Sequence, residues 1–184
     1  MEAFLVSTGV VALAEVGDKT QLLALALATR FRSPRPIILG ILVATLLNHG
    51  AAAWLGAWAT SLLDEETLRW ILGASFLAMA VWVLIPDRLD EAEAVVDGTG
   101  VFTATLVSFF LAEMADKTQV ATVALAAGYP SLTAVIAGTT MGMLLANVPV
   151  VYLGDRAGER VPVRLVHGVA AALLAALGLL TLLG

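Results

Sequence analysis

Six long apolar stretches account for most of this chain of 184 residues. Each stretch is long enough for a helix that crosses a bilayer, which needs about 20 mostly apolar residues. Their apolar residues run in continuous blocks, without the alternation that the strands of a membrane β-barrel require. The sequence therefore predicts an all-α membrane protein with six transmembrane helices, at roughly residues 3–28, 36–61, 68–86, 101–127, 131–154 and 162–183.

The composition supports the same fold class. Hydrophobic residues make up 60% of the chain and charged residues 14%, against about 25% charged residues in ordinary soluble domains. The chain has no cysteine, which excludes disulfides and thiolate metal sites. Residues 1–28 lack a basic start and a cleavage signature followed by a mature domain, so we expect them to form a retained helix.

Basic residues predict how the helices are oriented. Arg69 falls on one face of the predicted topology, beside the acidic run 64–66. Because basic loops stay in the cytoplasm, we expect both termini outside it, in the inner (plasma) membrane of a bacterium. Residues 87–100 then form an acidic cytoplasmic linker. The opposite, cytoplasmic face carries Arg30, Arg32, Arg35, Arg88, Arg156, Arg160 and Arg164.

A seven-residue motif occurs twice, 98 positions apart. Residues 15–21 read EVGDKTQ and residues 113–119 read EMADKTQ. The same offset pairs Gly40 with Gly138, which indicates an internal duplication.

The duplication divides the chain into a first three-helix repeat, residues 1–86, and a second, residues 101–184. Because each half has an odd number of helices, the second half must enter the membrane from the opposite side. We therefore expect two inverted three-helix repeats. Secondary transporters share this architecture and bind their substrate near the membrane midplane, where the repeats meet.

Each motif puts ionisable residues in the middle of a predicted span. Glu15 and Glu113 lie about twelve residues into their helices, or roughly 18 Å at 1.5 Å per residue. Each charge at this depth costs about 2.5–3.5 kcal/mol, so we expect the charges to converge in one central pocket. In a continuous helix the spacing i, i+3, i+4 would point each set in one direction. The six residues are Glu15, Asp18, Lys19, Glu113, Asp116 and Lys117.

The predicted pocket suits a hard divalent cation. Four carboxylates and two lysines leave a formal charge of about −2, which one divalent cation or two protons would neutralise. Carboxylate oxygens favour Ca²⁺, Mg²⁺ or Mn²⁺. Gly17 could break its helix and free backbone carbonyls. Neutral oxygens or helix hydrogen bonds are the alternative roles for Thr20, Gln21, Thr118 and Gln119.

The E-x-G-D-K-[ST] motif, present twice in a six-helix inverted repeat, resembles the transmembrane protein 165 family. The resemblance covers essentially the whole chain. It implies a cation/proton antiporter that moves Mn²⁺ and Ca²⁺ and is related to the lysine exporter superfamily. It also implies that the transported ion is bound by Glu15, Asp18, Glu113 and Asp116. Ala115 stands where the motif has glycine, so we expect a stiffer helix there.

Other polar residues have two interpretations. Lys19 and Lys117 are predicted charge partners of the acids, or members of i,i+4 ion pairs that only hold each helix. His49 and Asn147, which the repeat pairs, are candidates for a proton relay or ligation, or for inter-helix hydrogen bonds. His167 receives no role.

Small residues predict where helices pack closely. Gly40-x-x-x-Ala44 and Gly138-x-x-x-Gly142 are patterns that allow two helices to approach within contact of their backbones. We expect these helices to pack against the two motif helices.

The leading functional hypothesis is a secondary active transporter that exchanges Mn²⁺ or Ca²⁺ for protons and exports the cation. Its partners would be the cation, protons and the lipid bilayer, with no cofactor and no nucleic acid. The alternative is an exporter of a small organic cation such as a basic amino acid, which would need roomy or aromatic walls. An enzyme would need histidine ligands or a nucleophile beside a base, which the motifs lack. A scaffold subunit without transport activity is a further alternative.

Overall fold

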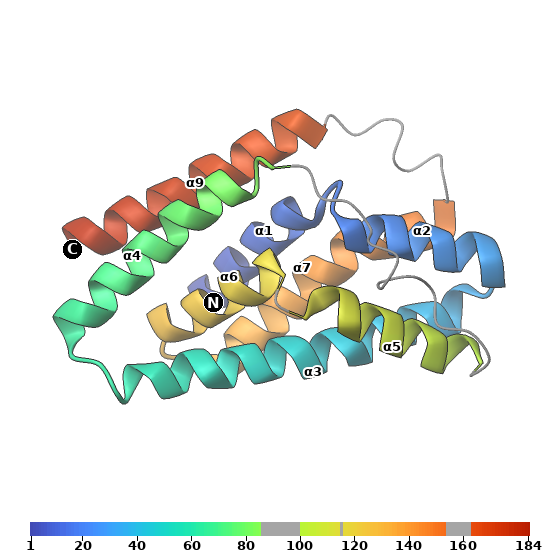
Figure 1. Cartoon of the computed structure of the whole chain (residues 1–184), viewed down its shortest axis with the longest axis horizontal. Coiled ribbons are helices and arrows are strands. Elements are labelled where there is room, and N and C mark those ends of the chain that lie inside the picture. The colour runs from blue at the N-terminus through green and yellow to red at the C-terminus, as the bar shows by residue number, and fades with distance from the viewer. Residues whose placement is uncertain (86–99, 115, 154–162) are drawn as a thin grey trace.

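The computed structural model describes residues 1–85, 100–114, 116–153 and 163–184, and within these ranges the chain is all α (Figure 1). Ala115, Arg88, Arg156, Arg160 and the predicted linker, except Gly100, lie outside the described residues. The described helices are α1 (Glu2–Glu15), α2 (Lys19–Phe31), α3 (Pro34–Thr60), α4 (Glu65–Trp82), α5 (Val101–Glu113), α6 (Lys117–Gly128), α7 (Leu132–Leu153) and α9 (Val163–Leu183).

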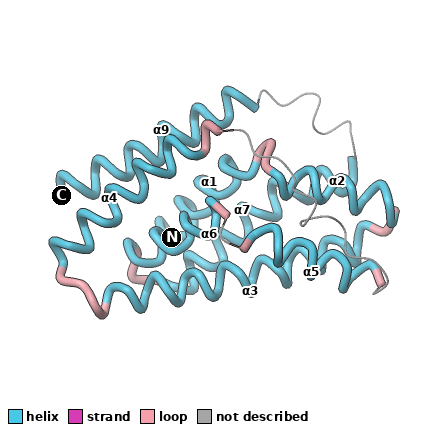
Figure 2. Tube along the Cα trace, in the orientation of Figure 1, coloured by secondary structure: helices cyan, strands magenta, loops and turns pink. Residues whose placement is uncertain are grey.

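The predicted all-α fold is confirmed, and three of the described helices, α3, α7 and α9, are long and apolar enough to cross a membrane. Two predicted spans, 3–28 and 101–127, are each built from two helices. The first is α1 followed by α2, and the second is α5 followed by α6. Figure 2 shows the short non-helical connections that join α1 to α2 and that flank α6.

Small residues bring the helices together as the sequence predicts. A Cβ placed on Gly142 of α7 would lie 2.7 Å from the Thr8 carbonyl oxygen of α1. A Cβ on Gly40 of α3 would lie 2.7 Å from the Thr105 Cβ of α5. Any larger side chain at either position would push the helix backbones apart. The packing of α7 on α1 and of α3 on α5 therefore depends on glycine.

Two apolar clusters enclose the middle of the molecule. One joins α1, α4, α6 and α9, and includes Val10, Phe76 and Leu174. The other joins α2, α3, α5 and α7 around Leu27 and Phe109. Figure 1 shows α4 and α9 side by side along one edge, while α2 and α5 occupy the opposite end. The interrupted helices thus break between two regions of packed apolar side chains.

Candidate cation site

The first motif lies at a break between two helices. α1 ends at Glu15, and α2 begins at Lys19. Gly17 has φ +80°, a conformation that residues with a side chain rarely adopt. Asp18 is extended, with φ −81° and ψ 167°. The predicted break at Gly17 is confirmed.

The second motif is also interrupted, although Ala115, where a stiffer helix was expected, lies outside the described residues. α5 ends at Glu113, and α6 begins at Lys117. Asp116 has φ −80° and ψ 165°, close to the values of Asp18. The Asp116 carboxylate also accepts a hydrogen bond from the Thr118 amide.

The breaks bring acids of both halves together. Glu15 and Glu113 are fully buried, and Asp116 is 5% exposed. One carboxylate oxygen from each lies within 4.8 Å of the others. Oxygens on opposite sides of a single ion at 2.3–2.6 Å would be about 5 Å apart. The three carboxylates are therefore spaced for one divalent cation.

Asp18 and the two lysines form ion pairs that join the halves. Lys117 Nζ lies 2.8 Å from Asp18 Oδ1, and Lys19 Nζ lies 3.5 Å from Asp116 Oδ1. Asp18 is fully buried, although it is not one of the three clustered acids. Because each lysine reaches an aspartate of the other motif, the interpretation as i,i+4 pairs within one helix does not account for these contacts.

Threonine hydroxyls orient the glutamates. The Thr20 hydroxyl donates to a Glu15 carboxylate oxygen. The Thr118 hydroxyl donates to Glu113 Oε2 at 2.9 Å. Each threonine follows its glutamate by five residues, a spacing that a continuous helix would not bring together. The broken backbone is what makes these contacts.

Gln21 connects the first break to α7. Its side-chain oxygen accepts a hydrogen bond from the Gly17 amide at 2.9 Å, and its side-chain nitrogen donates to the Ala146 carbonyl at 2.9 Å. Gln119, its counterpart in the repeat, is partly buried. The contacts of Gln21 fit the predicted helix hydrogen bond.

His49 and Asn147 have different surroundings, although the repeat pairs them. The His49 side chain is fully buried on α3, and its Nε2 lies 3.8 Å from Glu113 Oε2. The Asn147 side-chain nitrogen instead donates to the Met143 carbonyl of its own helix at 3.1 Å. The structure therefore brings His49 to the acids.

His167 is a residue that the sequence analysis missed. Its Nε2 forms a hydrogen bond with the Val16 carbonyl oxygen, which belongs to the first break. A Cβ on Gly17 would meet the side chain of Val163, from the first turn of the same helix, α9. No sequence signal identifies this contact, because the repeat, whose offset is 95 residues in the third helix of each half, places the apolar Leu72 opposite His167.

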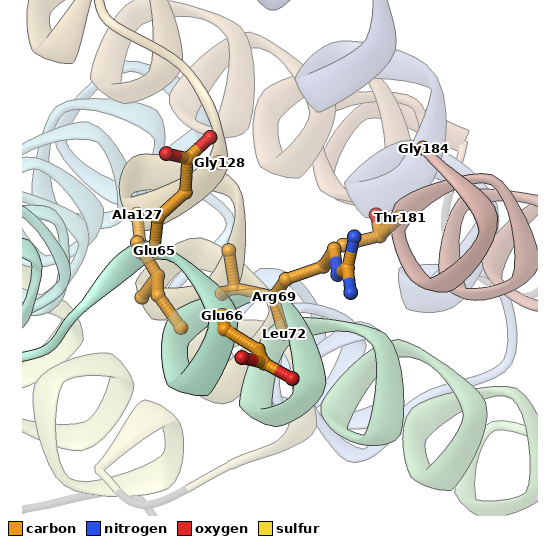
Figure 3. A pocket seen from close by; sticks show the side chains of 9 residues that line it. Glu65, Glu66, Arg69, Leu72, Ala127, Gly128, Thr181 and Gly184 are labelled. Atoms are coloured by element: carbon orange, nitrogen blue, oxygen red, sulfur yellow. The ribbon is translucent and has the colours of Figure 1, made fainter.

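A cavity of about 670 Å³ lies away from these acids, at the start of α4 (Figure 3). Figure 3 shows Glu65, Glu66 and Arg69 around it, with the guanidinium directed toward Thr181. Gly128, the last residue of α6, also lines the cavity. Asp116 directly precedes α6, and Gly128 ends it. The 12 residues of this helix, at 1.5 Å per residue, put about 18 Å between the acids and the cavity.

Comparisons with known proteins match this chain to one family and to one curated relative. A family model described as "Divalent cation/proton antiporter GDT1" matches residues 3–91 and 101–184. A Vibrio cholerae serotype O1 protein named "Putative manganese exporter" is 50% identical over 182 residues, which cover 98% of this chain and 90% of that protein. No solved structure matches the chain.

Proposed function

Because this chain belongs to the GDT1 family of divalent cation/proton antiporters, we propose that it exports Mn²⁺ from the cytoplasm in exchange for protons, using its buried acids. It is a membrane transporter and not an enzyme. The name of the Vibrio cholerae relative supports Mn²⁺ as the cargo. The observation that carries the proposal is the approach of Glu15, Glu113 and Asp116, from both motifs, within 4.8 Å.

The proposal gives the aspartates and the glutamates different tasks, because they lie on opposite sides of each break. Asp18 and Asp116 stand at the N-termini of α2 and α6, where the helix dipole favours a negative charge, and each has a lysine partner. Glu15 and Glu113 stand at the C-termini of α1 and α5, where the dipole opposes a negative charge. In the proposed mechanism the charges within each aspartate–lysine pair cancel, Asp116 adds an oxygen ligand, and the charges of the two glutamates are neutralised by one divalent cation or by two protons.

Six spans arranged as two inverted repeats are part of the proposal, and reciprocal contacts support it. Gly40 packs on Thr105, and Gly138 packs on Ser7. These two contacts are the same contact after a shift of 98 residues, with the halves exchanged. The pairs Lys19–Asp116 and Lys117–Asp18 are related by the same shift.

Rocking of one half against the other would then expose the acids to each side in turn. Both termini outside the cytoplasm, as the basic loops predict, would leave α2 and α5 in the inner half of the membrane. Cytoplasmic Mn²⁺ would bind the deprotonated glutamates, and protons from outside would displace it.

Proton flux driven by Mn²⁺ in proteoliposomes tests the proposal. We expect Glu15→Gln and Glu113→Gln each to abolish the flux. Either change removes one of the two negative charges that the divalent cation or the protons neutralise. Glu66→Gln is the matched control, since Glu66 is exposed beside the distant cavity, and its flux should stay unchanged. Full flux in either buried variant would refute the proposal.

A further inference from the structure

We infer that His49 is a nitrogen ligand of the transported ion and makes the site prefer a first-row transition ion such as Mn²⁺ over Ca²⁺. This inference rests on the proposed function, because it assigns a residue and a selectivity to the same site. None of the comparisons assigns a role to this histidine.

The position of the imidazole carries the inference. The His49 side chain is fully buried, and its Nε2 lies 3.8 Å from Glu113 Oε2. Among the described residues neither ring nitrogen has a hydrogen-bond partner. Polar side-chain atoms in a protein interior almost always have such a partner. An ion between His49 and Glu113 would supply one.

The separation also suits a shared ion. A distance of 3.8 Å is too long for a hydrogen bond between the imidazole and the carboxylate. Two donor atoms at about 2.0–2.3 Å from one ion, as in transition-metal sites, are at most about 4.6 Å apart.

The residue before His49 forms a hydrogen bond between α3 and α5. The Asn48 side-chain nitrogen donates to the Phe110 carbonyl oxygen at 3.0 Å. Phe110 belongs to α5, three residues before Glu113 at the end of that helix. This hydrogen bond fixes the rotation of α3 against α5 and so keeps His49 beside Glu113.

The second half lacks this nitrogen. Asn147 is the counterpart of His49 in the repeat, and its side-chain nitrogen is bound to the Met143 carbonyl. Ca²⁺ takes oxygen ligands, whereas imidazole is a ligand of transition ions. A site with three carboxylates and one imidazole therefore discriminates against Ca²⁺, while the carboxylates alone would accept both ions.

Pulsed electron paramagnetic resonance of the purified protein loaded with Mn²⁺ is the direct test. We expect nitrogen modulation from a bound imidazole in the wild-type protein and in His167→Asn, which changes the other histidine of the chain. Bound Mn²⁺ without nitrogen modulation would overturn the role of His49 and leave the proposed function intact. A protein that binds no Mn²⁺ would overturn both.

The variant His49→Asn tests the selectivity, because it installs the side chain found at the repeat counterpart. We expect the modulation to disappear and the Mn²⁺ affinity to fall about tenfold or more, as for other residues that support metal binding. The Ca²⁺ affinity, measured by competition, should change by less than about threefold. An equal loss for both ions would overturn the inference. If this variant does not fold, the wild-type modulation still decides.

Discussion

Buried ion pairs between the two motifs are the main feature of the molecule at the scale of single residues. Lys117 and Asp18 are 3% and 0% exposed, and their charged atoms are 2.8 Å apart. Two such charges stabilise the protein only as a pair, because removing one leaves the other uncompensated in an apolar interior. The pair thus ties the start of α6 to the start of α2.

We predict that Lys117→Met destabilises the protein by about 3–5 kcal/mol, the usual cost of removing one partner of a buried ion pair. The double variant Asp18→Asn with Lys117→Met should recover much of this loss, since neither charge remains. Denaturant unfolding in detergent measures both values. The prediction fails if the double variant is as unstable as the sum of the two single variants.

The acids were predictable from the sequence, but their partners were not. A carboxylate in an apolar stretch is visible without a structure, and its cost implies a neighbour of opposite charge. Spacing along a continuous helix suggested Lys19 for Glu15. The break turns the chain between these residues, and Lys19 reaches Asp116 of the other motif. Contacts of this kind, and that of His167 with Val16, arise from tertiary packing that residue spacing does not encode.

At the scale of elements, the interrupted helices distinguish this chain from a simple bundle. Gly17 was a sequence signal for the first break, and the structure confirms it. Ala115 gave no such signal, yet α5 still ends at Glu113 and α6 begins at Lys117. One residue's helix propensity is too weak a predictor where capping and packing oppose it.

We predict that Gly17→Ala destabilises the protein by about 1–2 kcal/mol through its positive φ, with a further loss from contact with Val163. Adding Val163→Ala to Gly17→Ala should recover only the part of the lost stability that is due to contact with the Val163 side chain. Gly9→Ala is the matched control, because a Cβ at Gly9 in α1 meets nothing within 4 Å. Thermal unfolding of the variants measures these effects. Equal stabilities of Gly17→Ala and Gly9→Ala would contradict the prediction.

The start of α4 gives a prediction that depends on pH. The Asp64 carboxylate accepts hydrogen bonds from the Thr67 amide at 2.9 Å and the Thr67 hydroxyl at 2.7 Å. These bonds lower the pKa of Asp64 from its usual value of 3.8. A lowered pKa means that Asp64 stabilises the fold fully above pH 3.8 and that this contribution is lost as the pH falls through the lower folded-state pKa.

The chemical shift of the Thr67 amide proton should therefore titrate below pH 3.8. In Asp64→Asn the shift should stay constant over this range, because asparagine also caps helices but has no charge to lose. A titration that persists in Asp64→Asn would show that another group is responsible.

At the scale of the whole molecule, the charge count predicts electroneutral exchange. If the aspartate–lysine pairs cancel, Glu15 and Glu113 exchange two protons for one divalent cation. A membrane potential of 100 mV changes the free energy of moving one net charge across the membrane by about 2.3 kcal/mol. This free energy corresponds to a change of roughly 50-fold in the accumulation ratio of Mn²⁺. We therefore expect the steady-state Mn²⁺ gradient driven by a pH gradient to be unchanged by an imposed potential. A shift of about 50-fold would instead indicate one proton per cation.

The same helix contact occurs in both halves of the chain. It joins Gly40 to Thr105 and, after the shift of 98 residues, Gly138 to Ser7. Under the proposed inverted-repeat mechanism, the two halves would exchange roles between two arrangements of nearly equal free energy. We then expect the positions that differ between the halves to set the populations of these arrangements. Leu72 has no nitrogen with which to imitate the hydrogen bond of His167 to Val16. We expect such unmatched side chains to set which side of the membrane the binding site of the empty protein faces.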